Sequence, residues 1–174
     1  HDGSSGISVY ETDITDADAP GRIVGAAVEA FGRLDILFNN AGVSRRALVG
    51  EQTEEEWNLT LSVNLTAQFR LATAAVPHLK DSPAGRIINT ASVMARMTDY
   101  GLAAYSASKA GVGGMTRALA LDLGKFGITA NYIEPGAIRT GMTKAAFDDD
   151  EIAAIWAKKA ALRRLGEPAD IARA

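Results

Sequence analysis

The feature that most constrains this chain is a regular alternation of short apolar segments with longer segments of helical periodicity. The apolar segments are typical of strands: Ile7–Glu11, Ile36–Phe38, Arg86–Thr90 and Ile128–Ile133. The helical segments that separate them are Pro20–Phe31, Thr53–Leu79 and Tyr105–Lys125. Strands that alternate with helices form parallel βαβ units. The sequence therefore predicts an α/β fold, a doubly wound parallel sheet with helices on both faces, in one domain over residues 1–174.

Local signals refine this prediction. Ile36–Phe38 is apolar without interruption, as is typical of a strand buried on both faces of a parallel sheet. Thr53 followed by Glu56 forms the pattern of a helix capping box, and a break in that helix is expected near Asn64. Further helices are expected to begin near Glu151 and at Pro168.

Composition excludes several classes of function. The net charge is −3 without a basic cluster, which argues against nucleic acid as a partner. Cysteine is absent, and the two histidines, His1 and His78, are far apart, so we expect no metal site. No uncharged apolar run approaches the roughly 18 residues of a membrane span, and no signal peptide opens the chain. We therefore expect a cytoplasmic protein that does not contact a membrane.

The residues after each predicted strand are candidate ligand contacts, because ligands of open α/β sheets bind at the carboxyl ends of the strands. These residues are small or turn-forming: Asn39–Gly42, Ala91-Ser92 and Glu134–Thr140, the last of which includes Pro135 and Gly136. Such residues let a flat ligand approach the backbone closely, but tight turns use the same residue types. The pattern alone leaves both interpretations open.

Tyr105 and Lys109 lie four residues apart on one predicted helix and therefore share a face. A free tyrosine has a pKa of roughly 10, and a nearby ammonium lowers it by about 1 to 3 units, toward the range of useful acid–base catalysis. Most such pairs are ordinary helix surface. Ser92, thirteen residues before Tyr105 at a strand end, favours a catalytic interpretation because its hydroxyl can hold a carbonyl or alcohol oxygen.

The motifs occur together in one order. They are Asp13-Ile14, Gly32–Gly42, Glu55–Leu65, Ile88–Ser92, Tyr105–Lys109, Ile128–Thr140 and Leu162–Ala172. In this order and spacing the chain resembles the short-chain dehydrogenase/reductase family, whose fold is Rossmann-like, and within it the 3-oxoacyl-carrier-protein reductases. The resemblance covers nearly the whole chain.

The resemblance implies roles for four catalytic residues. Tyr105 would be the general acid/base, and Lys109 would lower its pKa and bind the nicotinamide ribose. Ser92 would position and polarise the substrate oxygen. Asn64 would hold a water in the proton relay behind the lysine, while its alternative is a helix-break residue that bonds to backbone, and both can hold.

The resemblance also implies NAD or NADP as cofactor, with no preference between them. Its binding residues would include Tyr105 and Lys109 together with residues from three other segments. Asp13 and Ile14 would contact the adenine, Asn40, Ala41 and Gly42 would line the adenosine and ribose, and Pro135, Gly136, Ile138 and Thr140 would face the carboxamide end.

Some positions depart from the family. Ala91 replaces a common serine, and Tyr132 and Glu134 are bulkier than the usual residues before Pro-Gly. The glycine-rich TGxxxGxG turn is absent, and the opening HDGSSG matches only the loop before the family's third strand. We therefore expect a partial fold without the first two strands and the last one, with an open strand edge and bare apolar faces.

The segment 141–165 corresponds to the family's substrate-covering lid, and its apolar residues predict a fairly apolar carbonyl or alcohol substrate. The alternative is that they pack the lid onto the body. The family resemblance also implies a homo-oligomer, a dimer or tetramer. For function we expect a 3-oxoacyl-carrier-protein-reductase-like enzyme. The alternatives are a sugar or small-alcohol dehydrogenase of the family, or an inactive fragment with a structural or interaction role.

Overall fold

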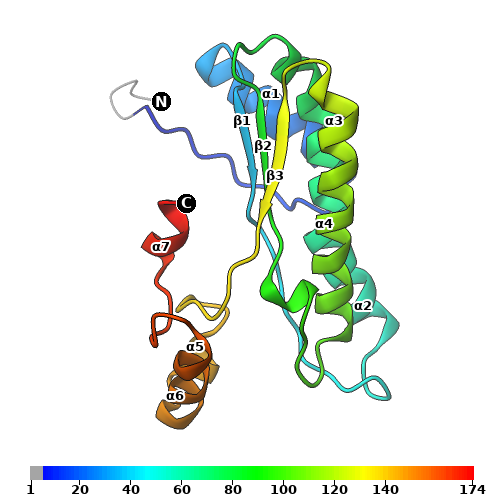
Figure 1. The fold of residues 1–174 in the computed structure, drawn as a ribbon. Helices are drawn as coiled ribbons and strands as arrows, with labels where there is room; N and C mark the ends of the chain where they lie inside the picture. Colours follow the sequence, from blue (N-terminus) through cyan, green and yellow to red (C-terminus); the bar gives the residue numbers. More distant parts are fainter. Residues whose placement is uncertain (1–5) are drawn as a thin grey trace.

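A three-stranded parallel sheet is the centre of the computed structural model, which describes residues 6–174 (Figure 1). The strands are β1 (Ile36–Asn39), β2 (Arg86–Thr90) and β3 (Thr129–Ile133), in the order β1-β2-β3. The register pairs Ile36 with Arg86 and Arg86 with Thr129. The predicted parallel βαβ arrangement is therefore confirmed. The first five residues of the HDGSSG segment lie outside the described part of the chain.

Helices α1 (Ala19–Phe31), α3 (Ala67–Lys80) and α4 (Ala103–Gly124) form one layer against this sheet (Figure 1). Helix α3 packs on β1 and β2, α4 packs on β2 and β3, and α1 packs on α3. Their apolar faces enclose one core, whose most buried large members are Leu79, Ile87 and Ile128. This core fixes the position of α4 relative to the strand ends.

The opposite face of the sheet carries no such helix layer among residues 6–174. Ile36 and Phe38 point to that face and are 56% and 50% exposed, whereas Asn39 on the helix side is buried. The prediction that Ile36–Phe38 is buried on both faces is therefore wrong for the described chain, because only one face is covered. The expectation of bare apolar surface is confirmed.

The predicted helix Thr53–Leu79 is interrupted where the sequence indicated. It consists of α2 (Glu54–Leu61), a π-helical turn over Ser62–Thr66 that contains Asn64, and α3. The capping box is present: the Thr53 hydroxyl accepts the Glu56 N–H, and the Glu56 carboxylate accepts the Thr53 N–H. A π-helical turn is a frequent mark of a functional site, because the extra residue redirects a side chain.

The prediction of a strand over Ile7–Glu11 is wrong. These residues lie in irregular chain outside the sheet, and Val9 is 89% exposed. A strand exists only through hydrogen bonds to a neighbouring strand, and the neighbours in this sheet are β1, β2 and β3 alone. Local β propensity was therefore insufficient to form one here.

Beyond β3 the chain forms a separate group of short helices, α5 (Lys144–Phe147), α6 (Asp150–Lys159) and α7 (Pro168–Ala172). Phe147, Ala153 and Leu165 form a second small core, with Trp156 packed against it. The Asp149 carboxylate caps α6 by accepting the N–H groups of Glu151 and Ile152. None of the helices in residues 6–174 combines the length and apolar character that a membrane crossing requires.

The position of Leu79 yields a test of this core. Leu79 is fully buried between α3 and the sheet, so Leu79→Ala should lower the free energy of unfolding by about 2–5 kcal/mol, measured by urea denaturation. Leu162→Ala, in the exposed chain between α6 and α7, is the matched control and should change it by no more than about 0.5 kcal/mol. Equal effects of the two substitutions would contradict the packing of α3 described above.

Candidate active site

The carboxyl ends of all three strands meet at one edge of the sheet. Asn39 is in register with Asn89, and Thr90 is in register with Ile133. Beyond them the Ala91 N–H donates to the Ile133 carbonyl, and the Val93 N–H donates to the Pro135 carbonyl. The segments after β2 and β3 therefore stay side by side past the sheet, and the predicted site residues Ser92 and Pro135 are brought together.

Lys109 ties helix α4 to the end of β2. Its ammonium donates a hydrogen bond of 2.7 Å to the Thr90 carbonyl and lies 5.7 Å from the centre of the Tyr105 ring. The residue is only 3% exposed, which is exceptional for a lysine. The predicted sharing of a helix face by Tyr105 and Lys109 is confirmed, and that face points at the strand ends.

Ser92 occupies the start of a short 3-10 turn, Val93–Ala95, directly after β2. Its hydroxyl accepts the Met94 N–H at 3.1 Å, and the residue is buried. The same hydroxyl interacts with the Tyr105 side chain and pulls the pKa of the phenol downward. The side chains of Ser92 and Tyr105 therefore lie close together although they come from different elements.

The buried side chain of Asn64 makes three hydrogen bonds next to these residues. Its side chain accepts the Val43 N–H at 2.8 Å and donates to the Val43 carbonyl at 2.9 Å and the Ser108 hydroxyl at 3.1 Å. The Ser108 hydroxyl in turn donates to the Tyr105 carbonyl at 2.7 Å. The predicted backbone-bonding role of Asn64 is thus present, and the residue links the chain after β1 to the helix that carries Tyr105.

Burial is the largest cause of the pKa shifts of Lys109 and Tyr105. It lowers the pKa of Lys109 to about 8 from a model-compound value of 10.5, because charge is disfavoured in the interior. Burial also raises the pKa of Tyr105, and the contact with Ser92 only partly opposes this. The sequence predicted that Lys109 would lower the pKa of Tyr105. The net shift of the Tyr105 pKa is upward because the phenol is buried, and Lys109 is not among its causes, so the lowering by the lysine stays a prediction.

Gly42 provides a cradle next to Lys109. A Cβ atom at this position would lie 3.3 Å from the Asn64 Oδ1 and 3.5 Å from the Lys109 ammonium nitrogen. The glycine therefore leaves room beside a buried cation and an amide, both of which can bond to hydroxyl groups. These residues fit a ligand that presents hydroxyls at this point, as the ribose of a dinucleotide does.

The predicted residues of the adenosine end lie on the periphery. Asp13 accepts hydrogen bonds from the Thr15 N–H and hydroxyl at 2.8 and 2.7 Å, which lower the pKa of its carboxyl and shape the turn before α1. Ile14 in the same turn is half-buried. Asn40 and Ala41 are exposed just beyond β1, and the Asn40 amide oxygen accepts the Thr90 hydroxyl at 3.4 Å.

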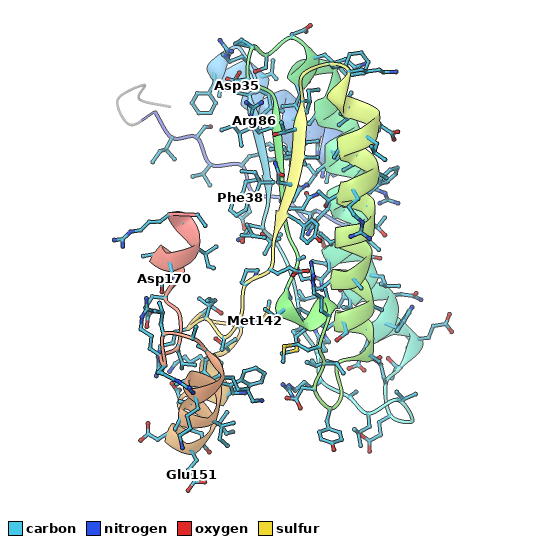
Figure 2. The ribbon with its side chains drawn as sticks, in the orientation of Figure 1. Asp35, Phe38, Arg86, Met142, Glu151 and Asp170 are labelled. Atoms are coloured by element: carbon cyan, nitrogen blue, oxygen red, sulfur yellow. The ribbon has the colours of Figure 1, made fainter. Side chains whose placement is uncertain are left out.

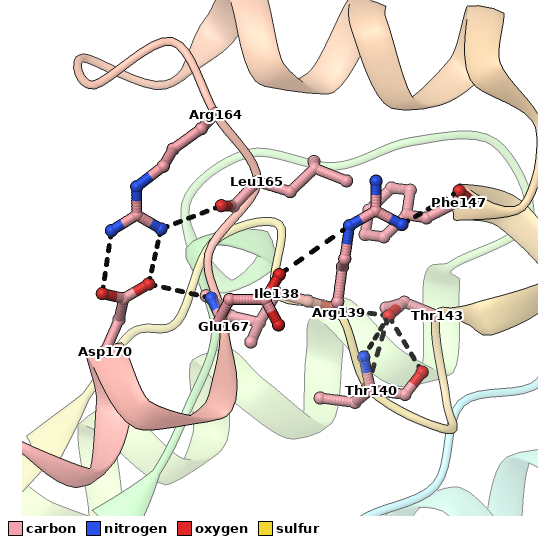
Figure 3. A network of polar contacts seen from close by, with 9 residues as sticks. All are labelled: Ile138, Arg139, Thr140, Thr143, Phe147, Arg164, Leu165, Glu167 and Asp170. Carbon is pink, nitrogen blue, oxygen red and sulfur yellow. Dashed lines mark hydrogen bonds and ion pairs between the residues drawn. The ribbon is translucent and has the colours of Figure 1, made fainter.

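Ile138 and Thr140 belong to the segment between β3 and α5 (Figure 3). Ile138 pairs with Gly166 through a parallel bridge, and the Thr143 hydroxyl donates to the Ile138 carbonyl at 2.6 Å. The Thr140 N–H donates to the Thr143 hydroxyl at 3.0 Å. The structure therefore holds both residues by contacts within the segment 137–166, while Pro135 and Gly136 remain beside the Ser92 segment.

The chain after β3 has a polar network of its own (Figure 3). The Arg164 guanidinium donates to both oxygens of Asp170, at 2.7 and 2.9 Å, and Asp170 also accepts the Glu167 N–H. These residues and Arg139 line a pocket of 630 Å³. Arg164 is paired with Asp170 and holds α7 to the chain before it, so it contributes to the structure of this region.

The sequence did not indicate a second buried chain of hydrogen bonds beneath the site. The Asn39 amide donates to Asn89 at 2.8 Å, and Asn89 donates to the Thr116 hydroxyl at 2.9 Å. All three residues are buried. This chain joins β1, β2 and α4, and only the pairing register of the strands could have revealed it.

Comparisons with known proteins show which family the chain is similar to. A family model described as enoyl-(acyl carrier protein) reductase matches residues 2–174. The 3-oxoacyl-[acyl-carrier-protein] reductase FabG of Vibrio cholerae is 40% identical over 161 residues, which are 92% of this chain and 65% of that protein. Trans-4-hydroxycyclohexanecarboxylate dehydrogenase of Sinomonas cyclohexanicum is 43% identical over 131 residues, 75% of this chain and 50% of that protein. The crystal structure of gox2181 superposes with a TM-score of 0.87 at 28% identity, over 93% of this chain and 64% of that one.

The buried ammonium predicts an unusual effect on stability. In the unfolded chain Lys109 binds a proton up to pH 10.5, but in the folded chain only up to about 8, so its burial destabilises the fold most below pH 8. Lys109→Met should therefore raise the free energy of unfolding at pH 7 by about 1–3 kcal/mol, as measured by urea denaturation. The gain should shrink between pH 8 and 10.5. A loss of stability at pH 7 would show that the Thr90 hydrogen bond outweighs the desolvation cost.

Proposed function

The chain belongs to the short-chain dehydrogenase/reductase family of oxidoreductases, and from that premise we propose that it interconverts a ketone and a secondary alcohol with NAD or NADP. The observation that carries this proposal is the convergence of Ser92, Tyr105 and buried Lys109 at the carboxyl ends of the strands. A lysine with a pKa lowered to about 8 costs stability, and such costs are characteristic of functional sites.

Each residue has a defined task in this proposal. The Tyr105 hydroxyl donates a proton to the carbonyl oxygen in reduction and accepts one from the alcohol in oxidation. The Ser92 hydroxyl, which already interacts with the phenol, holds the same substrate oxygen. When bound, the nicotinamide supplies or accepts the hydride.

Lys109 and Asn64 have supporting roles in this proposal. The Lys109 ammonium favours the phenolate form of Tyr105 by charge and is placed to bond ribose hydroxyls in the cradle at Gly42. Asn64 fixes the Val43 segment and, through Ser108, the first turns of α4. We assign it to the proton relay behind the lysine, because its side chain lies beside the same cradle as the ammonium.

For the substrate we propose a 3-oxoacyl thioester or another ketone with an apolar substituent. The segment 141–165, proposed as the lid, exposes Met142 and Ile155, while Phe147 is buried in the lid's own core. The FabG relative supports an acyl substrate. The dehydrogenase of Sinomonas cyclohexanicum supports the alternative of a small alicyclic alcohol.

We also propose that the chain forms a homo-oligomer. Phe69 on α3 and Leu121 on α4 are large apolar residues that are exposed on the two longest helices of the layer. A partner copy that covers them would remove apolar surface from water.

Removal of the Tyr105 hydroxyl tests the proposed chemistry. Tyr105→Phe should reduce kcat/KM at least about 10²-fold with NADH or NADPH, because proton transfer loses its donor, while the unfolding midpoint stays nearly unchanged. Reduction of acetoacetyl and cyclohexanone-type ketones, followed at the absorbance of the reduced nicotinamide, provides the assay.

Tyr10→Phe is the matched control, since Tyr10 lies in irregular chain outside the sheet and its side chain is exposed. It should retain the activity of the unmodified protein. Full activity of Tyr105→Phe would refute the assignment of Tyr105 as acid/base, and binding of a nicotinamide dinucleotide without any turnover would favour a non-catalytic role for the chain.

A further inference from the structure

Two loops on the side of the strand ends are joined to each other by side-chain and backbone contacts. One loop, residues 43–53, follows β1, and the other, residues 96–102, precedes α4. The Arg46 guanidinium donates to the Asp99 carboxylate at 3.0 Å and to the Tyr100 carbonyl at 3.2 Å. We call this arrangement the Arg46 latch. It connects residues more than fifty positions apart in the sequence.

Backbone contacts reinforce the latch. The Ala47 N–H donates to the Gly101 carbonyl at 3.1 Å. Gly101 has a φ of +71°, and a Cβ there would lie 3.2 Å from the Ala47 nitrogen, so the close approach requires glycine. The Asp99 carboxylate also accepts the Tyr100 N–H at 2.9 Å, which fixes the carboxylate in the orientation that Arg46 binds.

The joined loops lead directly into the proposed catalytic residues. Loop 43–53 begins at Val43, which Asn64 holds by two hydrogen bonds. Loop 96–102 ends three residues before Tyr105, and its Thr98 hydroxyl lies 3.0 Å from the Ser106 hydroxyl on α4. The latch therefore completes a continuous series of contacts from the end of β1, through both loops, to helix α4, which carries Tyr105.

Stabilisation of the fold does not account for the latch. The side chains of Arg46 and Asp99 are 57% and 34% exposed, and ion pairs of this kind contribute little to stability. The guanidinium instead fixes the orientation of one loop relative to the other, because its planar fork bonds a carboxylate and a carbonyl at once. The Tyr100 N–H, Arg46 and, from helix α6, Lys159 all lower the pKa of Asp99, so the carboxylate stays charged at neutral pH.

Exposed apolar side chains sit on both joined loops. They are Leu48 and Val49 on the first loop and Met97 and Tyr100 on the second. Large apolar groups that remain exposed at the rim of a site are suited to bind an apolar part of a ligand. Their relative placement depends on the latch, because neither loop contains a helix or strand at these positions.

We propose that Arg46 is a positioning residue for the substrate: by latching loop 43–53 to loop 96–102 it holds an apolar rim that binds the part of the substrate beyond the reacting carbonyl. This inference rests on the ketone reduction proposed above. It specifies a substrate with an extended apolar substituent, such as a medium-length acyl chain.

A comparison of two substrates tests the proposal in the full chain. The probes are the N-acetylcysteamine thioesters of acetoacetate and of 3-oxooctanoate, reduced with a saturating nicotinamide cofactor. Arg46→Ala should raise KM for the longer thioester about 5- to 20-fold, with kcat and the KM for acetoacetyl thioester within about twofold. Arg45→Ala, a neighbouring exposed arginine, is the control and should change neither KM.

Two further variants separate positioning from general loosening. Asp99→Asn keeps an acceptor for the Tyr100 N–H but removes the charge that Arg46 binds, so it should raise the same KM as Arg46→Ala. Because both act on one contact, the double variant should be no worse than either single one. Arg46→Lys, which keeps the charge without the fork, should fall between the unmodified protein and Arg46→Ala.

Hydrogen exchange gives a readout that needs no turnover. Arg46→Ala should speed amide exchange in residues 96–102 and leave exchange in α3 and β2 unchanged. Unchanged exchange in 96–102, or an unchanged ratio of the two KM values, would overturn the latch proposal. Absence of turnover by the unmodified protein with both thioesters would instead overturn the 3-oxoacyl reductase function.

Discussion

The hydrogen bond from the Lys109 ammonium to the Thr90 carbonyl is the interaction on which the site depends. It fixes the first turns of α4 against the end of β2, and with them the distance between Tyr105 and Ser92. Burial of the ammonium lowers its pKa and costs folding free energy. The rest of the structure has to supply that free energy, and the core of Leu79, Ile87 and Ile128 beneath α3 and α4 does so.

Several polar side chains buried around this lysine are joined by hydrogen bonds, while the buried Oδ1 of Asn39 has no partner among residues 6–174. Asn64 satisfies both backbone groups of Val43, and Asn39, Asn89 and Thr116 form a continuous chain through the helix side of the sheet. Unpaired, such groups would each cost folding free energy, whereas paired they specify one arrangement of strands and helices. The π-helical turn at Ser62–Thr66 contributes to this pairing, because it contains Asn64, whose side chain bonds to the Val43 backbone after β1.

The two faces of the sheet contribute differently. The helix-covered face encloses the main core, while the face of Ile36 and Phe38 carries exposed apolar side chains, of which Phe38 is labelled in Figure 2. The chain spans 65% of the length of the FabG relative from Vibrio cholerae. Helices α5 and α6 pack mainly on each other and on the chain around Leu165, so their small core is independent of the main one.

The sequence by itself determined the alternating elements, the break at Asn64 and the shared helix face of Tyr105 and Lys109, because periodicity, capping and turn residues are local. Local signals also produced the false strand at Ile7–Glu11 and the wrong burial of Ile36–Phe38, since strand pairing and coverage depend on distant neighbours. Only the tertiary structure decided the Asn39–Asn89–Thr116 chain, the Arg46 latch and the raised pKa of Tyr105. Each of these arises from groups that are far apart in the chain and meet only when the sheet has formed.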